Sequence, residues 1–267
     1  MKACLSQVTT LPASFADDLA TAAGAGFRFV EVWLTKLERH LEAHSLDATA
    51  NAIADAGLAF AAASVQGGLL VGSAEQRSAH LDHFKRRLDL CQRLGIPTIV
   101  LAPGFARREE IEVAAKHLIE AARWAAGFGV RLALEFHAAD AFCNNLDTAA
   151  TLIEACAEPN LGLCLDAFHF HTGPSKTEDL ARLTAKNLFH VQLCDATGRP
   201  RELLADADRV LPGDGEINLA SLADRLRAIG YAGAVSVEMM NQMLRPVNAA
   251  QVRKAARQSL ERFGAAP

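Results

Sequence analysis

Short apolar runs alternate with more polar, amphipathic segments along the whole chain. The apolar runs are rich in Leu, Val, Ile and Ala and are only a few residues long, as expected for strands that are buried on both faces of a parallel sheet. They occupy residues 3–8, 27–34, 58–65, 97–103, 131–136, 161–168, 188–196 and 234–240. Alternation of this kind is typical of repeated βα units and predicts a parallel sheet.

The segments between these runs have the features of helices. We expect helices at residues 15–26, 46–57, 74–94, 109–128, 147–157, 176–185, 219–229 and 248–263. Ser14 is a suitable N-cap for the first helix, and Gly95 and Gly129 stand where later helices should stop. Eight such units predict a closed (β/α)8 barrel. An open doubly wound sheet is the main alternative, but the glycine-rich phosphate turn that usually follows its first strand is missing.

Length and composition agree with one barrel domain. The chain has 267 residues, 51% of them hydrophobic, and no shift in composition marks a linker. A single barrel of this type typically needs about 250 residues. We therefore expect one α/β domain over residues 1–267.

Charge and cysteine content narrow the range of expected partners and cellular compartments. The net charge of −4 offers no general attraction to phosphate backbones, so we expect no nucleic-acid partner. The six cysteines have no CxxC spacing and several lie in apolar runs, which indicates buried free thiols in a reducing compartment. The first residues lack the apolar stretch of a signal peptide, and no run is long enough to span a membrane. We expect a cytoplasmic protein with no membrane partner.

Polar side chains stand at the carboxyl ends of the last four apolar runs. They are Glu135, Asp166, Gln192 and Glu238. A single carboxylate at a strand end is ordinary and often pairs with a neighbouring base. Four such groups on consecutive strands predict a shared site, because the carboxyl ends of barrel strands meet at one mouth, where active sites are built.

Further polar residues near these strand ends are candidates for substrate binding. His169 follows Asp166 by three residues and can turn over the mouth, while His137 shares a strand face with Glu135. Glu31 ends the second run and could orient a substrate hydroxyl or a basic side chain, although a lone residue of this kind is more often structural. His190 shares a face with Gln192 but lies one layer deeper, which favours a buried structural histidine.

The loop after the seventh run is long for a βα connection, and long loops at this face commonly carry function. It contains Arg199, Arg201 and Arg209, each able to hold a carboxylate, phosphate or enolate oxygen. Any of the three could instead be an ordinary solvated surface charge, and the sequence does not rank them. We predict that Arg201 contacts the substrate.

The motifs around these residues resemble a known family over the whole chain. The segments LEFH, LDAFHF, FHVQLCDA, LPGDGEIN and SVEM, in this order, are similar to those of the xylose isomerase-like TIM barrels, the sugar phosphate isomerases and epimerases. The resemblance implies one divalent metal held by Glu135, Asp166, Gln192 and Glu238, with His169 contacting substrate.

One position departs from the family pattern. The usual fourth ligand is a histidine, whereas this chain has Gln192, as is known in the hydroxypyruvate isomerase branch, which the motifs resemble most closely. A carboxamide oxygen makes the site all-oxygen and favours Mg²⁺ or Mn²⁺, with Co²⁺, Ni²⁺ and Zn²⁺ as alternatives.

The resemblance implies a metal-dependent isomerase or epimerase of a small sugar, ketose or hydroxy-carbonyl acid, in carbohydrate metabolism. Glu135 and Glu238 would exchange protons with neighbouring carbons through a cis-enediolate, while the metal polarises the carbonyl. A dehydratase of an inosose- or dehydroshikimate-like substrate is the nearest alternative. A catalytically silent barrel and an abasic-site endonuclease are less favoured, the second because it needs a basic face. The sequence does not decide whether the protein forms a homo-oligomer.

Overall fold

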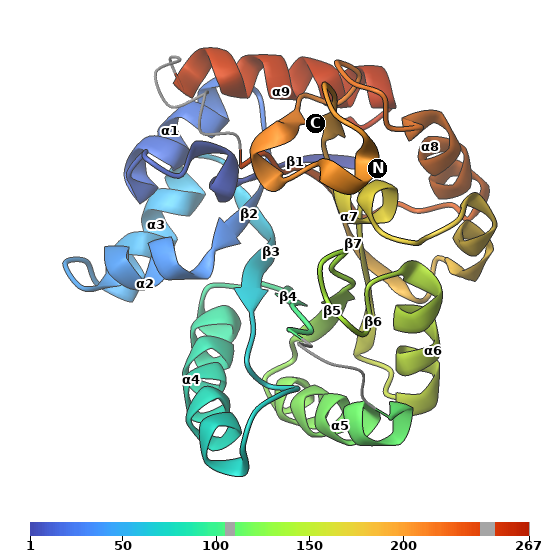
Figure 1. The fold of residues 1–267 in the computed structure, drawn as a ribbon. Helices are drawn as coiled ribbons and strands as arrows, with labels where there is room; N and C mark the ends of the chain where they lie inside the picture. Colours follow the sequence, from blue (N-terminus) through green and yellow to red (C-terminus); the bar gives the residue numbers. More distant parts are fainter. Residues whose placement is uncertain (105–109, 241–248, 267) are drawn as a thin grey trace.

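A closed barrel of eight parallel strands forms the centre of the protein (Figure 1). The computed structural model describes residues 1–104, 110–240 and 249–266. Around the barrel the strands are β1 (Lys2–Ser6), β10 (Ala234–Val237), β7 (Leu188–Leu193), β6 (Leu161–Asp166), β5 (Arg131–Glu135), β4 (Thr98–Leu101), β3 (Ala59–Gln66) and β2 (Phe29–Trp33). Pairing of β1 with both β10 and β2 closes the ring, which confirms the predicted (β/α)8 architecture.

Helices surround the ring of strands (Figure 1). They are α1 (Phe15–Gly24), α2 (Leu34–Leu41), α3 (Leu46–Asp55), α4 (Ala74–Arg93), α5 (Ile111–Gly127), α6 (Leu146–Cys156), α7 (Ala167–Thr172), α8 (Leu219–Ala228) and α9 (Ala249–Phe263). The Ser14 side chain accepts the backbone N–H of Asp17, so it caps α1 as expected. Gly95 and Gly129 adopt φ values of 67° and 68° just after α4 and α5, the left-handed conformation that ends many helices.

Two short helices and one 3₁₀ segment differ from the pattern-based expectation. The helices α2 and α7 begin directly after β2 and β6, within stretches expected to be strand or loop. The segment predicted as a helix at 176–185 is instead the 3₁₀ helix η2 (Thr177–Arg182). Thr184 and Asn187 exchange two side chain-to-backbone hydrogen bonds just after it, and this turn stops further helix. Glu109 and Asn248, the predicted first residues of two helices, lie outside the described residues.

The barrel interior is built in layers by the two-residue period of the strands. Val100, Ala133 and Cys164 form a small buried cluster inside the ring, separate from the larger core between strands and helices. Glu135 and Asp166 follow Ala133 and Cys164 by two residues, so they share the inward face one layer nearer the mouth. The small apolar layer thus forms a floor beneath polar side chains.

All six cysteines are buried free thiols, as the sequence predicted. Among the described helices, none combines the length and the apolar character that crossing a bilayer requires.

Candidate metal and active site

The predicted strand-end residues converge at the mouth of the barrel. Glu135 ends β5 and Asp166 ends β6, while Gln192 is paired in register with Asp166 across β6 and β7. Glu238 follows β10 and is tied to β7 by its backbone N–H, which donates to the Leu193 carbonyl at 3.0 Å. All four residues are buried, with at most 8% of their surface exposed. The parallel register of four neighbouring strands therefore builds the cluster.

His169 joins this cluster because of the way α7 begins. One oxygen of Asp166 accepts the backbone N–H groups of Phe168 and His169 at 2.6 and 3.2 Å, which caps the helix immediately after the strand. The turn brings His169 Nε2 to 3.8 Å from a carboxylate oxygen of Glu135. Potential ligand atoms of Glu135, Asp166 and His169 lie within 4.8 Å of one another, a spacing that suits a metal ion.

The His169 imidazole is neutral and retains binding capacity. Burial lowers the pKa of His169 to about 4, and the nearby Arg209 and His137 act in the same direction, against the opposing effect of Asp166. Its Nδ1 is buried without a hydrogen-bond partner. The His137 ring lies 4.0 Å from the His169 ring, between centroids, and is partly exposed at the mouth. Both predicted histidines thus border the cluster.

Arg209 is the loop arginine that enters the cluster. Its guanidinium is fully buried, 2.9 Å from Asp166 Oδ2 and 3.6 Å from Glu238 Oε2, and it lies over the Phe168 ring. The candidate Arg201 is exposed, and its guanidinium donates to the Gly173 carbonyl at 3.3 Å. The local sequence does not separate the two arginines, because Arg201 lies close to Leu203 and Leu204 much as Arg209 lies close to Val210 and Leu211.

Asp195 holds the segment that carries Arg209. Residues Asp195–Ala196 (β8) and Arg209–Val210 (β9) pair antiparallel across the long loop. The Asp195 carboxylate accepts the backbone N–H groups of Gly213 and Ile217 at 3.0 and 2.8 Å. A Cβ on Gly215 would lie 2.5 Å from the Ala196 carbonyl, so only glycine fits there. The motif LPGDGEIN is therefore a clamp that fixes the loop.

Glu31 and His190 lie behind Gln192 inside the barrel. His190 Nε2 is 3.1 Å from one Glu31 oxygen, and the Gln192 amide nitrogen donates to the other at 2.9 Å. His190 is buried, as predicted. Glu31, expected to orient either a substrate hydroxyl or a basic side chain, contacts a basic side chain here and is fully buried.

The carboxylates of the cluster are more numerous than its permanent cations. Burial, and then the neighbouring Asp166, raise the pKa of Glu135 well above its usual value. Burial and the charge of Glu31 likewise raise the pKa of Glu238. Burial would also raise the pKa of Asp166, but contact with Arg209 lowers it overall. An added divalent cation would offset this mutual repulsion, so the donor set fits a metal.

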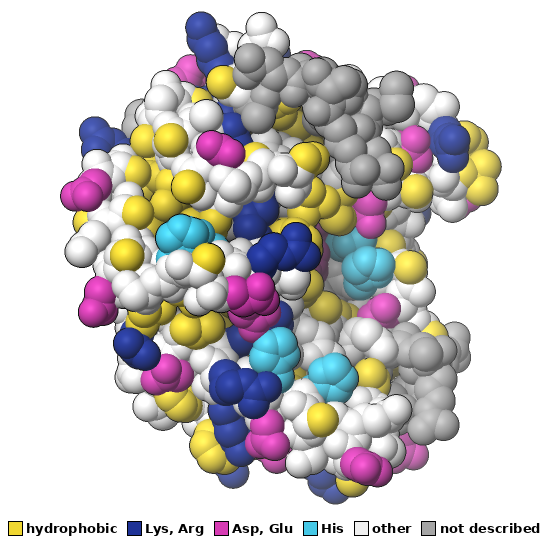
Figure 2. Space-filling view, turned by 90° about the vertical axis from the view of Figure 1, so that its left-hand side faces the viewer, with side chains coloured by type: hydrophobic (Ala, Val, Ile, Leu, Met, Phe, Trp, Pro, Cys, Tyr) yellow, Lys and Arg dark blue, Asp and Glu magenta, His cyan; other side chains and the backbone are white. Residues whose placement is uncertain are grey.

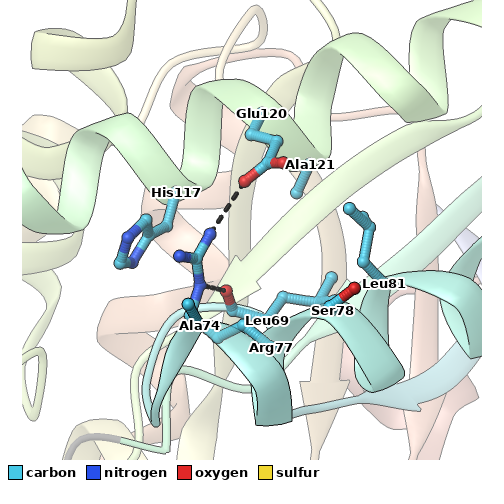
Figure 3. A pocket seen from close by; sticks show the side chains of 8 residues that line it. All are labelled: Leu69, Ala74, Arg77, Ser78, Leu81, His117, Glu120 and Ala121. Atoms are coloured by element: carbon cyan, nitrogen blue, oxygen red, sulfur yellow. Dashed lines mark hydrogen bonds and ion pairs between the residues drawn. The ribbon is translucent and has the colours of Figure 1, made fainter.

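A cavity elsewhere in the molecule lacks these features. It has a volume of about 160 Å³ and lies between α4 and α5 (Figure 3). Its arginine, Arg77, is already paired with Glu120 at 2.8 Å and donates to the Leu69 carbonyl. His117 likewise contacts the Leu70 carbonyl through Nδ1. The cavity contains none of the strand-end carboxylates, so we place the candidate active site at the barrel mouth.

Comparison with known proteins decides the family. The family model described as xylose isomerase-like TIM barrel matches residues 19–264. This chain belongs to the xylose isomerase-like TIM barrel family. The resemblance seen in the strand-end motifs is thereby confirmed.

Several known proteins are similar over most of this chain. The inosose isomerase of Halalkalibacterium halodurans is 30% identical over 268 residues, which covers 96% of this chain and 94% of that protein. A putative hydroxypyruvate isomerase of Streptomyces coelicolor is 28% identical over 242 residues, covering 82% of this chain and 83% of that protein. Among solved structures, the IOLI protein with a binding zinc atom has a TM-score of 0.93 and 27% identity, covering 98% of both chains.

Proposed function

We propose that this protein is a divalent-metal-dependent isomerase or epimerase of a small, sugar-like hydroxy-ketone. The observation that carries the proposal is a pair of buried glutamates, Glu135 and Glu238, at the ends of strands on either side of Asp166. A carboxylate can remove a proton from carbon and a carboxylic acid can return one, so such a pair suits proton transfer. Similarity to an inosose isomerase along the full chain supports the substrate class and makes a cyclic ketose the first substrate to test.

The metal would be held by the carboxylates of Glu135, Asp166 and Glu238, next to the neutral imidazole of His169. Gln192, the remaining member of the predicted ligand set, donates from its nitrogen to Glu238, while its oxygen accepts from Cys164. In this orientation it would support Glu238 instead of binding the metal through its oxygen. Oxygen ligands favour Mg²⁺ or Mn²⁺, and a nitrogen ligand also admits Zn²⁺, Co²⁺ or Ni²⁺. When bound, such an ion polarises the substrate carbonyl as a Lewis acid.

The residues of the chain then divide the proton transfer between them. One of Glu135 and Glu238 removes the proton from the carbon beside the carbonyl, and the other returns a proton to the adjacent carbon or to the opposite face of the same carbon. The first outcome is isomerisation and the second is epimerisation. The neutral His169 hydrogen-bonds the carbonyl oxygen, and Arg209 stabilises the negative charge of the enediolate.

The side of the molecule drawn in Figure 2 does not favour the endonuclease alternative. Figure 2 shows basic and acidic side chains interspersed over the side of the molecule that carries α1 to α4. The side chains drawn there form no continuous basic strip, and the net charge of the chain is −4. Binding to a DNA backbone relies on such a strip.

A reaction in heavy water tests the proposal. The protein is treated with a chelator, reloaded with Mn²⁺ and incubated in D₂O with an inosose, and products are followed by NMR and mass spectrometry. We expect an isomeric product that carries solvent deuterium on carbon, and no such product from Glu135→Gln or Glu238→Gln. A product lighter by one water would indicate a dehydratase instead. If the protein neither converts inososes or small ketoses nor binds a metal, the proposal is wrong and a catalytically silent barrel is the remaining interpretation.

A further inference from the structure

A chain of buried hydrogen bonds runs from the barrel axis to the proposed active site. His190 Nε2 contacts Glu31 at 3.1 Å, and the Gln192 amide nitrogen lies 2.9 Å from Glu31 and 3.0 Å from Glu238. On the far side of the carboxamide, Cys164 donates to the Gln192 oxygen at 3.1 Å. Glu31, His190 and Gln192 are each at most 1% exposed, so bulk water does not compete for these bonds.

The donors and acceptors along this series of hydrogen bonds fit one orientation of the Gln192 carboxamide. A carboxamide has two N–H donors on nitrogen and an acceptor on oxygen. Its nitrogen faces two carboxylate oxygens, those of Glu31 and Glu238, and its oxygen faces the thiol of Cys164. Rotating the carboxamide by half a turn would set its oxygen against two carboxylates and leave the thiol without an acceptor. The carboxylate of Glu31 therefore selects the orientation.

Glu31 can perform this task because its carboxylate offers a separate oxygen to each neighbour. One oxygen accepts from the Gln192 nitrogen, and the other lies 3.1 Å from His190 Nε2. An ionised carboxylate accepts hydrogen bonds about twice as strong as those between neutral groups. The pair of Glu31 and His190 is thus a fixed support behind Gln192.

We propose that Glu31 is a positioning residue, which together with His190 fixes the carboxamide of Gln192 and through it orients Glu238 in the active site. The inference rests on the proposed function and extends it to a residue two hydrogen bonds from the proposed metal and substrate. Among the described residues, Arg209 also approaches the Glu238 carboxylate, but at the longer distance of 3.6 Å. Loss of Glu31 would free Gln192 to rotate and leave Glu238 in the wrong orientation.

Glu31→Gln is the central test, since it removes the charge with little change in volume. Residues that orient a metal ligand from behind typically contribute about 10–100-fold to metal affinity or activity. We expect a fall of that size in Mn²⁺ affinity, measured by calorimetry, and a similar fall in kcat with little change in KM. The matched control is Glu38→Gln, because Glu38 also binds a histidine and an arginine, His83 and Arg87, but lies outside this cluster. The control should keep wild-type Mn²⁺ affinity.

A double-mutant cycle separates positioning from simple destabilisation. If Glu31 acts through Gln192, Glu31→Gln should have almost no further effect on Mn²⁺ affinity in a Gln192→Ala background. Full additivity of the two effects would overturn the proposal, as would wild-type affinity and kcat in Glu31→Gln alone. If Glu31→Gln does not fold, the pair replacement Glu31→Met with His190→Leu removes both buried partners together and should show the same loss of affinity.

The outcomes distinguish this inference from the proposed function. A wild-type protein that binds no divalent metal and turns over no ketose contradicts the proposed function itself. A wild-type protein that binds Mn²⁺ and is active, alongside an equally capable Glu31→Gln variant, contradicts only the positioning role.

Discussion

Two buried groups of charged side chains differ in their balance of charge. In the first, between α1, α2 and α9, Asp18 pairs with Lys36 at 2.5 Å and also with Arg253. In the second, at the barrel mouth, Arg209 faces the carboxylates of Asp166 and Glu238, and Glu135 lies close to Asp166. The first group has one carboxylate for two cations, and the second has an excess of carboxylates.

The difference separates a structural role from a chemical one. Asp18 also accepts the Thr10 hydroxyl at 2.6 Å, so its carboxylate is fully used in tying helices together. At the mouth, excess negative charge and burial keep the pKa values of Glu135 and Glu238 high. A buried group that lacks its counter-charge is costly for stability and is therefore expected at functional sites.

The largest expected effect is on turnover. Glu135→Gln and Glu238→Gln each remove a proton carrier, and general acid–base catalysis is typically worth about 10²–10⁴-fold. We expect kcat to fall by at least that range in the deuterium-incorporation assay, while the circular dichroism spectrum stays unchanged. Glu120→Gln, which removes a surface partner of Arg77, is the control and should remain active. Near-wild-type turnover in both active-site variants would refute the assignment.

The group around Asp18 should respond in stability, not in chemistry. Asp18→Asn leaves Lys36 and Arg253 buried without a counter-ion, and breaking a buried pair in this way typically costs about 3–5 kcal/mol. We expect the free energy of unfolding, measured with urea, to fall by that amount. Mn²⁺ affinity of the folded variant should remain at the wild-type value, and a marked loss of affinity would show that the two groups are linked.

Metal should stabilise the group at the mouth. A ligand that binds only the folded state at 100 times its dissociation constant adds about 2.7 kcal/mol. Titrating the chelated protein with Mn²⁺ or Mg²⁺ should therefore raise the melting temperature in the wild type and in Asp18→Asn, but much less in Glu135→Gln. An equal rise in all three proteins would place the bound ion elsewhere.

The smallest expected effect is a pH dependence of the chelated protein. The pKa of Glu135 in the folded state lies well above the usual 4.5, so the folded state holds a proton that the unfolded state releases. The free energy of unfolding should therefore fall as pH rises above about 4.5 and level off once Glu135 ionises. The total fall should be about 1.4 kcal/mol for every tenfold difference in the proton affinity of Glu135 between the folded and unfolded states. In Glu135→Gln the free energy of unfolding should fall less over this range. A steeper fall in the variant would contradict the raised pKa.

The sequence by itself determined the order of strands and helices and the inward face of each strand. Apolar periodicity and cap residues such as Ser14 are local signals, so they predicted the closed barrel and the meeting of Glu135, Asp166, Gln192 and Glu238 at its mouth. The short helix α7 was not predicted, because it depends on the Asp166 carboxylate capping the helix from the end of a strand. Its position decides where His169 lies.

Only the tertiary structure decided which partners these side chains have. Nothing in the local sequence distinguished Arg209 from Arg201. The hydrogen bonds of Asp195 to the following loop place Arg209, and not Arg201, in the site. The contact of Glu31 with Gln192 joins residues 161 positions apart in sequence, across the barrel interior. Local pattern encodes the period and the ends of each element, but such pairings arise when the barrel closes and unrelated strands bring their inward faces together.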